Sequence, residues 1–207
     1  MDAKNIVEKV KEHIPNVLGN DRYSKYAVLI PLVEKDGELH ILFEIRSYEL
    51  KRQPGDICFP GGRVDASDQT SKEAAIRETR EELGISENDI TTIYPLDYVV
   101  SPFGMLIYSF VGFIKSPDSI HINPSEVEDI FTVPLTFFLE NKPKVYHVDY
   151  NIKPDENFPI DLIVGGENYD WKVRKMEEQF YLYDDKVIWG LTAKILSHFI
   201  DILHNSK

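Results

Sequence analysis

Three glutamates at helical spacing are the residues of this sequence best suited to chemistry. At about 100° per helical residue, Glu82 lies roughly 40° from Glu78, and Glu81 lies roughly 60° away on the other side. The three carboxylates therefore share one side of a helix. They repel one another unless a cation lies among them, and Mg²⁺ and Mn²⁺ prefer such oxygen ligands. The alternative is a solvated acidic face with i,i+4 ion pairs, for which Arg77 and Arg80 are available.

A glycine pair lies upstream of these glutamates, in the segment Phe59-Pro60-Gly61-Gly62. Backbone without side chains can approach a metal ion or a phosphate closely, because no Cβ stands in the way. Most glycine turns are only turns, so the pair alone would indicate little. Its combination with the clustered carboxylates favours a metal or phosphate site over a solvated acidic face.

The glutamates require a helix, and the sequence predicts one over Thr70–Leu83. Thr70 and Glu73 form a capping-box pattern at its start, and Gly84 stands where a left-handed C-terminal residue belongs. Strands are predicted on both sides of this helix, and the turn Lys35-Asp36-Gly37 joins the first two as a hairpin. The predicted strands are Tyr26–Val33, Glu38–Arg46, Ile90–Val100 and Leu106–Ile114, and a short helix is predicted over Val133–Leu139.

Helices and strands mix without strict βαβ alternation, which favours an α+β or layered α/β/α domain with a mixed sheet. We predict one domain over residues 1–207, with an N-terminal helix within 1–20 and a C-terminal helix over 187–204. The segment 142–186 is rich in Tyr, Pro and Gly, and we expect loops and short strands there. The C-terminal helix is amphipathic, with candidate core positions Ile188, Leu191, Ile195, Phe199 and Leu203.

The composition limits the classes of partner. The 207 residues include 23 Lys and Arg against 35 Asp and Glu, which gives a formal charge of −12. This charge disfavours nucleic acid and anionic membranes as partners, whereas a small anionic substrate needs only a local basic cluster or a metal. The single cysteine, Cys58, allows no intramolecular disulfide, and the first residues contain no apolar signal segment. We therefore expect a cytoplasmic protein.

The segment from Gly62 to Ile85 resembles the signature of the Nudix hydrolases, G-x5-E-x7-R-E-U-x-E-E-x-G-U, in which U is apolar. The matching residues are Arg77, Glu78, Glu81, Glu82, Gly84 and Ile85. Three features depart from the signature. The spacing from Gly62 to Arg77 is one residue longer, Asp68 or Gln69 stands at the first Glu, and Thr79 occupies an apolar position.

Residues 42–62 resemble an element of the coenzyme A pyrophosphatase branch of this superfamily, whose loop is also longer by one residue. The element is L-L-T-x-R-S-x-x-L-R-x-H-x-G-x-V-A-F-P-G-G, and this chain has Gln53 in place of the histidine. The matching positions are Arg46, Ser47, Leu50, Gly55 and Phe59–Gly62. In addition, Ile188–Ala193 resembles the I-W-G-x-T-A opening of the last helix in that branch.

The resemblance implies an α/β/α sandwich in which the signature forms a loop–helix–loop catalytic motif. It implies a site for Mg²⁺ or Mn²⁺ held by Glu78, Glu81, Glu82 and the Gly62 carbonyl, with Arg77 orienting one glutamate. Family members often take a general base from a later loop. Here that base would be Glu126, which we favour over Glu128; the alternative is two solvated loop carboxylates.

Basic residues gather around the glycine loop of this otherwise acidic chain. They are Arg46, Lys51, Arg52 and Arg63. The resemblance implies that they bind the substrate together with the backbone of Gly61 and Gly62, because coenzyme A carries a 3′-phosphate besides its pyrophosphate. Arg46 is the strongest candidate, since it follows an apolar strand. Ordinary surface charge accounts equally well for about half of these residues.

Three functions stay open. The first is metal-dependent hydrolysis of coenzyme A or its thioesters to 3′,5′-ADP and 4′-phosphopantetheine, by attack of water on the pyrophosphate. The second is the same chemistry on ADP-ribose or another nucleoside diphosphate derivative. The third is a non-catalytic Nudix-fold sensor that binds a nucleotide, and the three glutamates argue against it. For assembly there is only the family expectation of a homodimer.

Overall fold

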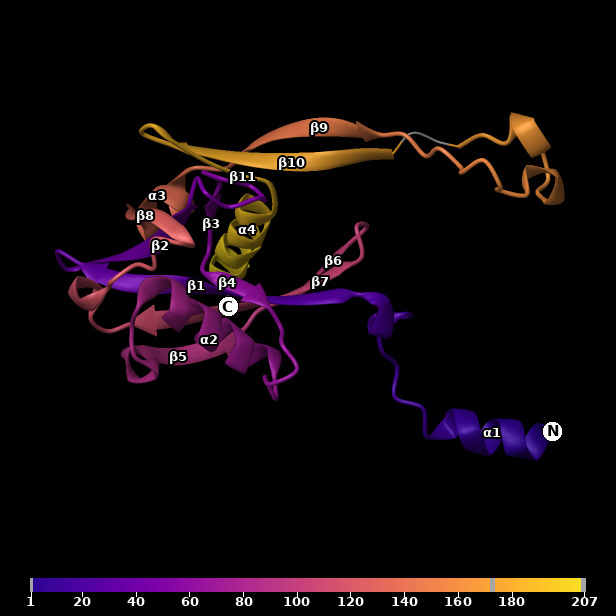
Figure 1. The fold of residues 1–207 in the computed structure, drawn as a ribbon, viewed down its shortest axis with the longest axis horizontal. Helices are drawn as coiled ribbons and strands as arrows, with labels where there is room; N and C mark the ends of the chain where they lie inside the picture. Colours follow the sequence, from indigo (N-terminus) through magenta and orange to yellow (C-terminus); the bar gives the residue numbers. More distant parts are fainter. Residues whose placement is uncertain (1, 172–173, 206–207) are drawn as a thin grey trace.

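The computed structural model describes residues 2–171 and 174–205, and a mixed β-sheet forms its centre (Figure 1). Strand β1 (Ser24–Lys35) pairs antiparallel with β2 (Glu38–Arg46) and parallel with β7 (Met105–Ile114), so the predicted hairpin is confirmed. The predicted strand Ile90–Val100 is two strands, separated at residues 96–98. The other strands of this sheet are β3 (Ile57–Cys58), β4 (Gly61–Arg63), β5 (Ile90–Pro95), β6 (Val99–Ser101) and β8 (Val127–Pro134).

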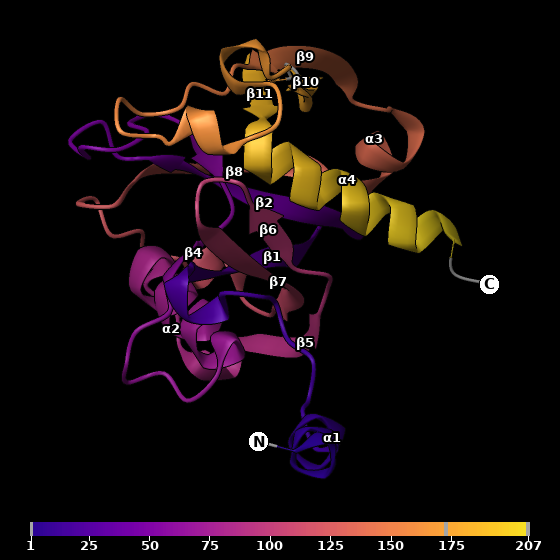
Figure 2. The same cartoon turned by 90° about the vertical axis from the view of Figure 1, so that its right-hand side faces the viewer.

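Two long helices cover opposite faces of the sheet, as the two views together show (Figures 1 and 2). Helix α2 (Ser71–Leu83) packs Ala74, Ala75 and Leu83 against one face. Helix α4 (Gly190–Asn205) buries Ile195, Leu196 and Phe199 against the other. Neighbouring residues of a strand point to opposite faces, so β1 alternately supplies both cores. This α/β/α layering confirms the predicted fold class.

The ends of α2 follow from the residues predicted to cap it. The Thr70 hydroxyl accepts a hydrogen bond from the Glu73 N–H at 3.2 Å. Gly84 adopts φ +63°, and its N–H donates to the Arg80 carbonyl at 2.9 Å. A Cβ at Gly84 would collide with the His121 carbonyl, so the close approach of the next segment also requires glycine here.

A second sheet covers α4, and the prediction of loops and short strands over 142–186 was right only in part. Strands β9 (Lys144–Tyr150), β10 (Arg174–Tyr183) and β11 (Lys186–Trp189) pair as one antiparallel sheet, and β10 is 10 residues long. The Pro and Gly residues that suggested loops gather in the connection between β9 and β10, which projects away from the central sheet (Figure 1). Tyr181 and Ile188 of this sheet are buried with the α4 side chains.

The C-terminal helix starts later than predicted, at Gly190, because residues 186–189 belong to β11. Ile188 is therefore a buried strand residue. Leu191 and Leu203 are 41% and 38% exposed, so their prediction as core positions was wrong. Five residues of the predicted 1–207 domain, namely 1, 172–173 and 206–207, lie outside the described residues.

The remaining helical elements are short. Helix α1 (Ala3–Lys11) occupies part of the predicted 1–20 range and has no buried residue. Helix α3 (Leu135–Glu140) confirms the short helix predicted after Pro134. The 3-10 turns are η1 (Asn20–Arg22), η2 (Glu87–Asp89), η3 (Pro117–Ser119), η4 (Ile160–Leu162) and η5 (Gly166–Asn168). Within residues 2–171 and 174–205, none of the helices has the length and apolar character needed to cross a membrane.

Candidate functional site

Two glutamates of α2 meet the glycine pair of β4. The Gly61 N–H donates to Glu82 Oε2 at 2.8 Å, and Glu82 is 5% exposed. A Cβ at Gly62 would collide with the Glu78 carboxylate, so only glycine permits this approach. The third predicted ligand differs, because the Glu81 side chain is 54% exposed. The structure thus brings Glu78 and Glu82 to the Gly61–Gly62 backbone and leaves Glu81 at the surface.

Arg77 connects this site to the loop that precedes α2. Its Nε and Nη2 donate to the two Asp68 oxygens, both at 3.0 Å, and Nη2 also donates to the Arg63 carbonyl at 3.1 Å. Its Nη1 donates to Glu78 Oε1 at 2.9 Å and to Glu81 Oε2 at 3.2 Å. Hydrogen bonding to Arg77 lowers the pKa of Asp68. Asp68, and not Gln69, therefore supplies the carboxylate at the first Glu of the signature, and Arg77 holds Glu78 in place.

The loop before β8 is fixed to the C-terminal end of α2. The Asn123 N–H donates to the Glu82 carbonyl at 2.9 Å, and the Glu126 N–H donates to the Asn123 carbonyl at 3.0 Å. Glu126 is half-buried, and its charge raises the pKa of Glu78 and of Glu82. Glu128 is exposed. Of the two predicted loop carboxylates, the structure brings Glu126 to the site.

A further carboxylate, Glu44 of β2, was missed by the sequence analysis. It is 1% exposed, and its Oε1 is buried without a hydrogen-bond partner among the described residues. The signal was present, since Glu44 interrupts the apolar run Ile41-Leu42-Phe43 on a predicted strand. Such a charge is rarely buried unless it is paired.

Negative charge exceeds positive charge at this site. Burial raises the pKa of Glu82 to about 8; the Gly61 N–H and Arg46 oppose this rise, while Glu78 and Glu126 add to it. Burial also raises the pKa of Glu44 well above its ordinary value, and Glu82 raises it further. The pKa of Glu78 is raised by burial against the effect of Arg77. Buried carboxylates with raised pKa values are typical of functional sites.

The predicted substrate-binding cations separate into two kinds. Arg46 is half-buried and lowers the pKa values of both Glu44 and Glu82, so it lies within their electrostatic reach. Its Nε is buried and has no hydrogen-bond partner in the described part of the chain. Lys51, Arg52 and Arg63 are exposed. The structure therefore brings Arg46 to the carboxylates and leaves the other three in solvent.

The residues present fit a divalent cation in chemistry. No group of three His, Cys, Asp or Glu side chains within residues 2–171 and 174–205 is already arranged as a ligand set. However, Glu44 Oε1 lacks a partner among the described residues, and the Glu78 carboxylate occupies the place beside Gly62 that a Cβ would fill. Hard cations bind such carboxylate and carbonyl oxygens. The residues that could hold one are Glu78, Glu82 and the Gly62 carbonyl.

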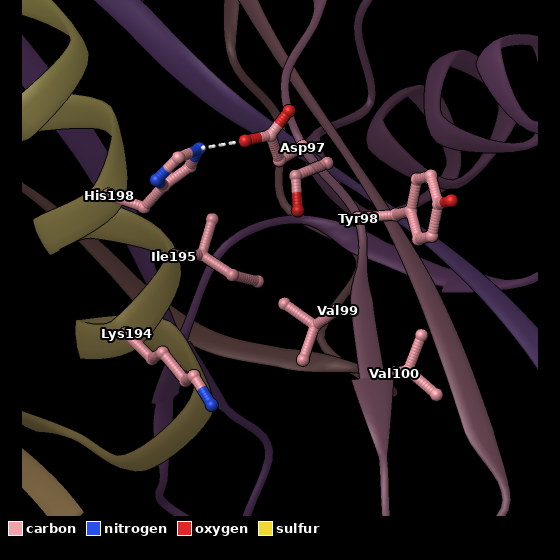
Figure 3. A pocket seen from close by; sticks show the side chains of 8 residues that line it. Asp97, Tyr98, Val99, Val100, Lys194, Ile195 and His198 are labelled. Carbon is pink, nitrogen blue, oxygen red and sulfur yellow. Dashed lines mark ion pairs between the residues drawn. The ribbon is translucent and has the colours of Figure 1, made fainter.

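Two hollows elsewhere on the molecule are not lined by any predicted site residue. One, of about 340 Å³, lies between α4 and the segment leading into β6, where His198 Nε2 is 3.0 Å from Asp97 Oδ2 (Figure 3). The other, of about 750 Å³, is lined by residues of and around η1 and by Ser101, Pro102 and Gly104. The candidate site is thus defined by its carboxylates and glycine backbone rather than by a cavity.

Other proteins are similar to this chain in sequence. The chain is 34% identical over 148 residues to the peroxisomal coenzyme A diphosphatase NUDT7 of Mus musculus, covering 69% of this chain and 62% of that protein. It is 39% identical over 126 residues to the peroxisomal coenzyme A diphosphatase ndx-8 of Caenorhabditis elegans, covering 56% of this chain and 51% of that protein. The chain therefore spans less than two thirds of the length of these relatives.

Among solved structures, a MutT/nudix family protein from Enterococcus faecalis superposes with a TM-score of 0.49 at 15% identity, covering 99% of this chain and 70% of that one. The family model described as NUDIX domain matches residues 24–155. That match spans β1 to the end of β9 and includes the glycine pair, α2 and the Glu126 loop. Because it covers more than half of the chain, the chain belongs to the NUDIX domain family.

Proposed function

We propose that this chain is a metal-dependent pyrophosphohydrolase that cleaves coenzyme A or its thioesters to 3′,5′-ADP and 4′-phosphopantetheine. The observation that carries the proposal is the convergence of Glu78 and Glu82 on the Gly61–Gly62 backbone in a chain of the NUDIX family. The substrate is supported by the upstream element at residues 42–62 and by the coenzyme A diphosphatase names of two relatives.

The residues of the site have different roles in the reaction, and the first is to bind the metal ion. Bound Mg²⁺ or Mn²⁺ would neutralise charge on the phosphate oxygens and lower the pKa of water. Glu78, Glu82 and the Gly62 carbonyl would hold the ion, and Arg77 fixes the Glu78 carboxylate through its 2.9 Å hydrogen bond. Glu81 also accepts a hydrogen bond from Arg77 and lies at the exposed edge of the site.

The remaining steps fall to the side chains that face the substrate. Glu126 accepts the proton of the attacking water as the general base. Arg46, whose Nε has no partner among the described residues, donates to a phosphate oxygen of the substrate. Lys51, Arg52 and Arg63 are exposed cations suited to a further phosphate, such as the 3′-phosphate of coenzyme A.

A second candidate function keeps the chemistry and changes the substrate. Gln53 stands where the upstream element has a histidine, and it adopts φ +52° at an exposed position. This departure supports ADP-ribose or another nucleoside diphosphate derivative as the alternative substrate. A cytoplasmic location and a homodimer stay predictions. The mouse relative is named as a peroxisomal protein.

Chromatographic product analysis tests the proposal. The protein would be incubated with Mg²⁺ or Mn²⁺ and, separately, coenzyme A, ADP-ribose, NADH and diadenosine polyphosphates, with Glu82→Gln as the inactive control. Fastest release of 3′,5′-ADP from coenzyme A is the expected result. Faster cleavage of another substrate would overturn the coenzyme A assignment alone. Saturable nucleotide binding without turnover at any metal concentration would replace the enzyme by a sensor.

A further inference from the structure

Glu44 has no role in the function proposed above, yet it is the most completely buried carboxylate of the site. We propose that Glu44 is a further ligand of the divalent cation and binds it from the sheet, opposite Glu82 on α2. This inference rests on the metal site of the proposed function and adds to it a ligand from outside the signature. It makes the cation bridge two layers of the fold.

The register of the strands places Glu44 on the α2 side of the sheet. Leu42 packs in the core beneath α2, and Glu44, two residues later, points the same way. Its lateral neighbours are Cys58 in β3 and Ile130 in β8. Neither neighbour carries a positive charge. A carboxylate at this position therefore has to find its partner in the direction of α2, where Glu82 lies.

Arg46 does not neutralise Glu44 by direct pairing. Within residues 2–171 and 174–205, both Glu44 Oε1 and Arg46 Nε are buried without hydrogen-bond partners, and no ion pair within 4.0 Å joins the two side chains. The other charges that act on Glu44 are those of Glu82 and Glu126, and both are negative. In its ionised form, an unpaired buried carboxylate beside two others is unfavourable unless a cation joins them. A divalent ion between Glu44 and Glu82 meets that requirement.

The upstream element differs from this chain at the position of Glu44. The element has threonine at the position of Glu44. A hydroxyl there is a weak neutral ligand at best, whereas a carboxylate is a strong charged ligand for Mg²⁺ and Mn²⁺. The element also supplies a replacement suited to the site, because Glu44→Thr introduces the threonine of the element at this position.

Direct measurement of Mn²⁺ binding tests the inference. Calorimetric titration and the electron paramagnetic resonance signal of free Mn²⁺ would be recorded for the full chain, without substrate, at one fixed pH. Glu44→Gln and Glu44→Thr are each expected to weaken Mn²⁺ binding by about 10-fold or more. Glu128→Gln is the matched control, since Glu128 is exposed, and it should bind like the original chain. Mn²⁺ should also raise the melting temperature less in the Glu44 variants.

The outcomes separate this inference from the proposed function. If either Glu44 variant folds and binds Mn²⁺ as tightly as the original chain, the inference is wrong, while hydrolysis of coenzyme A would still stand. If Mn²⁺ binding depends on Glu44 but no substrate is cleaved, the ligand assignment stands and the enzyme function fails. Unfolding of both Glu44 variants without metal would also overturn the inference, because Glu44 would then stabilise the metal-free fold.

Discussion

Two adjacent residues of β2, Phe43 and Glu44, point to opposite faces of the central sheet and have opposite effects on stability. Phe43 points towards α4 and stacks on Phe59 and Phe131, with ring centroids 5.1 Å and 5.4 Å away. Glu44 points towards α2 and lies near Glu82 with an oxygen that has no partner in the described chain. Both side chains are essentially inaccessible to solvent. Burial of the first stabilises the fold, whereas burial of the second in its ionised form opposes folding until a cation binds.

The difference between the faces follows from what covers each of them. The α4 face is closed by a helix and a second sheet, so apolar side chains from three layers fill it. The α2 face ends at the glycine pair, where the Gly61 N–H donates to Glu82 and the Glu78 carboxylate lies close to Gly62. The α4 face buries mostly apolar side chains, which stabilise the fold, whereas the α2 face buries the carboxylates of the candidate site. Complete burial alone does not distinguish the two.

Phe43→Ala is the strongest test of the stabilising face. Truncation leaves a cavity among stacked rings, and we expect a loss of about 3–5 kcal/mol in the free energy of unfolding. Denaturant titration followed by circular dichroism measures it. Leu162→Ala, at a side chain 83% exposed, should change the same quantity by less than about 0.5 kcal/mol. A loss at Phe43 of under about 1 kcal/mol would mean that the α4 face is loosely packed.

Glu82→Gln tests the chemical face. The substitution preserves shape and removes one charged metal ligand, so we expect pyrophosphatase turnover to fall at least about 100-fold, which corresponds to roughly 2.7 kcal/mol. The metal-free protein should stay folded, because a buried charge is lost rather than a packed apolar group. Steady-state kinetics with coenzyme A and Mg²⁺ give the comparison with Glu128→Gln, which should retain full activity. Normal turnover in Glu82→Gln would remove Glu82 from the metal site.

The sequence predicted the chemical face better than the stabilising one. Helix α2 carries its own start and stop signals at Thr70 and Gly84, and these local signals survive in the fold. The second sheet was missed because every residue of β9 from Lys144 to Asp149 is exposed, so no alternating apolar pattern marks the strand. Strand β11, which pairs with β10, fell in the range predicted as helix because its buried Ile188 suits a helix as well as a strand.

Within the site, the sequence could predict directly the residues whose spacing along a single helix brings them together. Glu78 and Glu82 share a helix side, so their approach to one another followed from the 3.6-residue period. The position of Glu44 depends on which face of β2 meets α2, and that depends on strand pairing far along the chain. Likewise Asp68 and Gln69 could be separated only by the hydrogen bonds that Asp68 accepts from Arg77.

The pH dependence of stability offers a test of the charged face without substrate. The folded-state pKa of Glu82, about 8, lies above its ordinary value of 4.5, so the native state binds more protons than the unfolded state between these values. The stability of the metal-free protein should therefore be highest near the acidic end of that window and fall as pH rises towards 8. We expect a loss of about 1 kcal/mol or more, or roughly 2–4 °C in melting temperature.

Melting curves at pH 5.5 and 8 in a metal chelator would show this fall. In Glu82→Gln the group that titrates is absent, so the slope should be shallower. Added Mn²⁺ should reduce the slope in the original chain, because a cation favours the ionised carboxylates. Identical slopes in the two proteins would mean that Glu82 is not the group that links stability to pH.

Ser109→Ala tests whether every buried oxygen without a partner indicates a metal site. Of the substitutions proposed here, the controls apart, it should change stability and activity least. Ser109 lies on β7 between Ile107 and Val111, on the α4 face; it is 2% exposed, and its Oγ has no partner in the described chain, like Oε1 of Glu44. A hydroxyl is neutral, so its burial needs no counter-ion, and alanine removes an unsatisfied group at little packing cost. We expect stability to stay level or rise by up to about 1 kcal/mol, with Mn²⁺ binding and turnover unchanged. A drop in Mn²⁺ affinity comparable with that of Glu44→Gln would show that the faces are not separate, since an oxygen on the α4 face would then support the cation on the other side of the sheet.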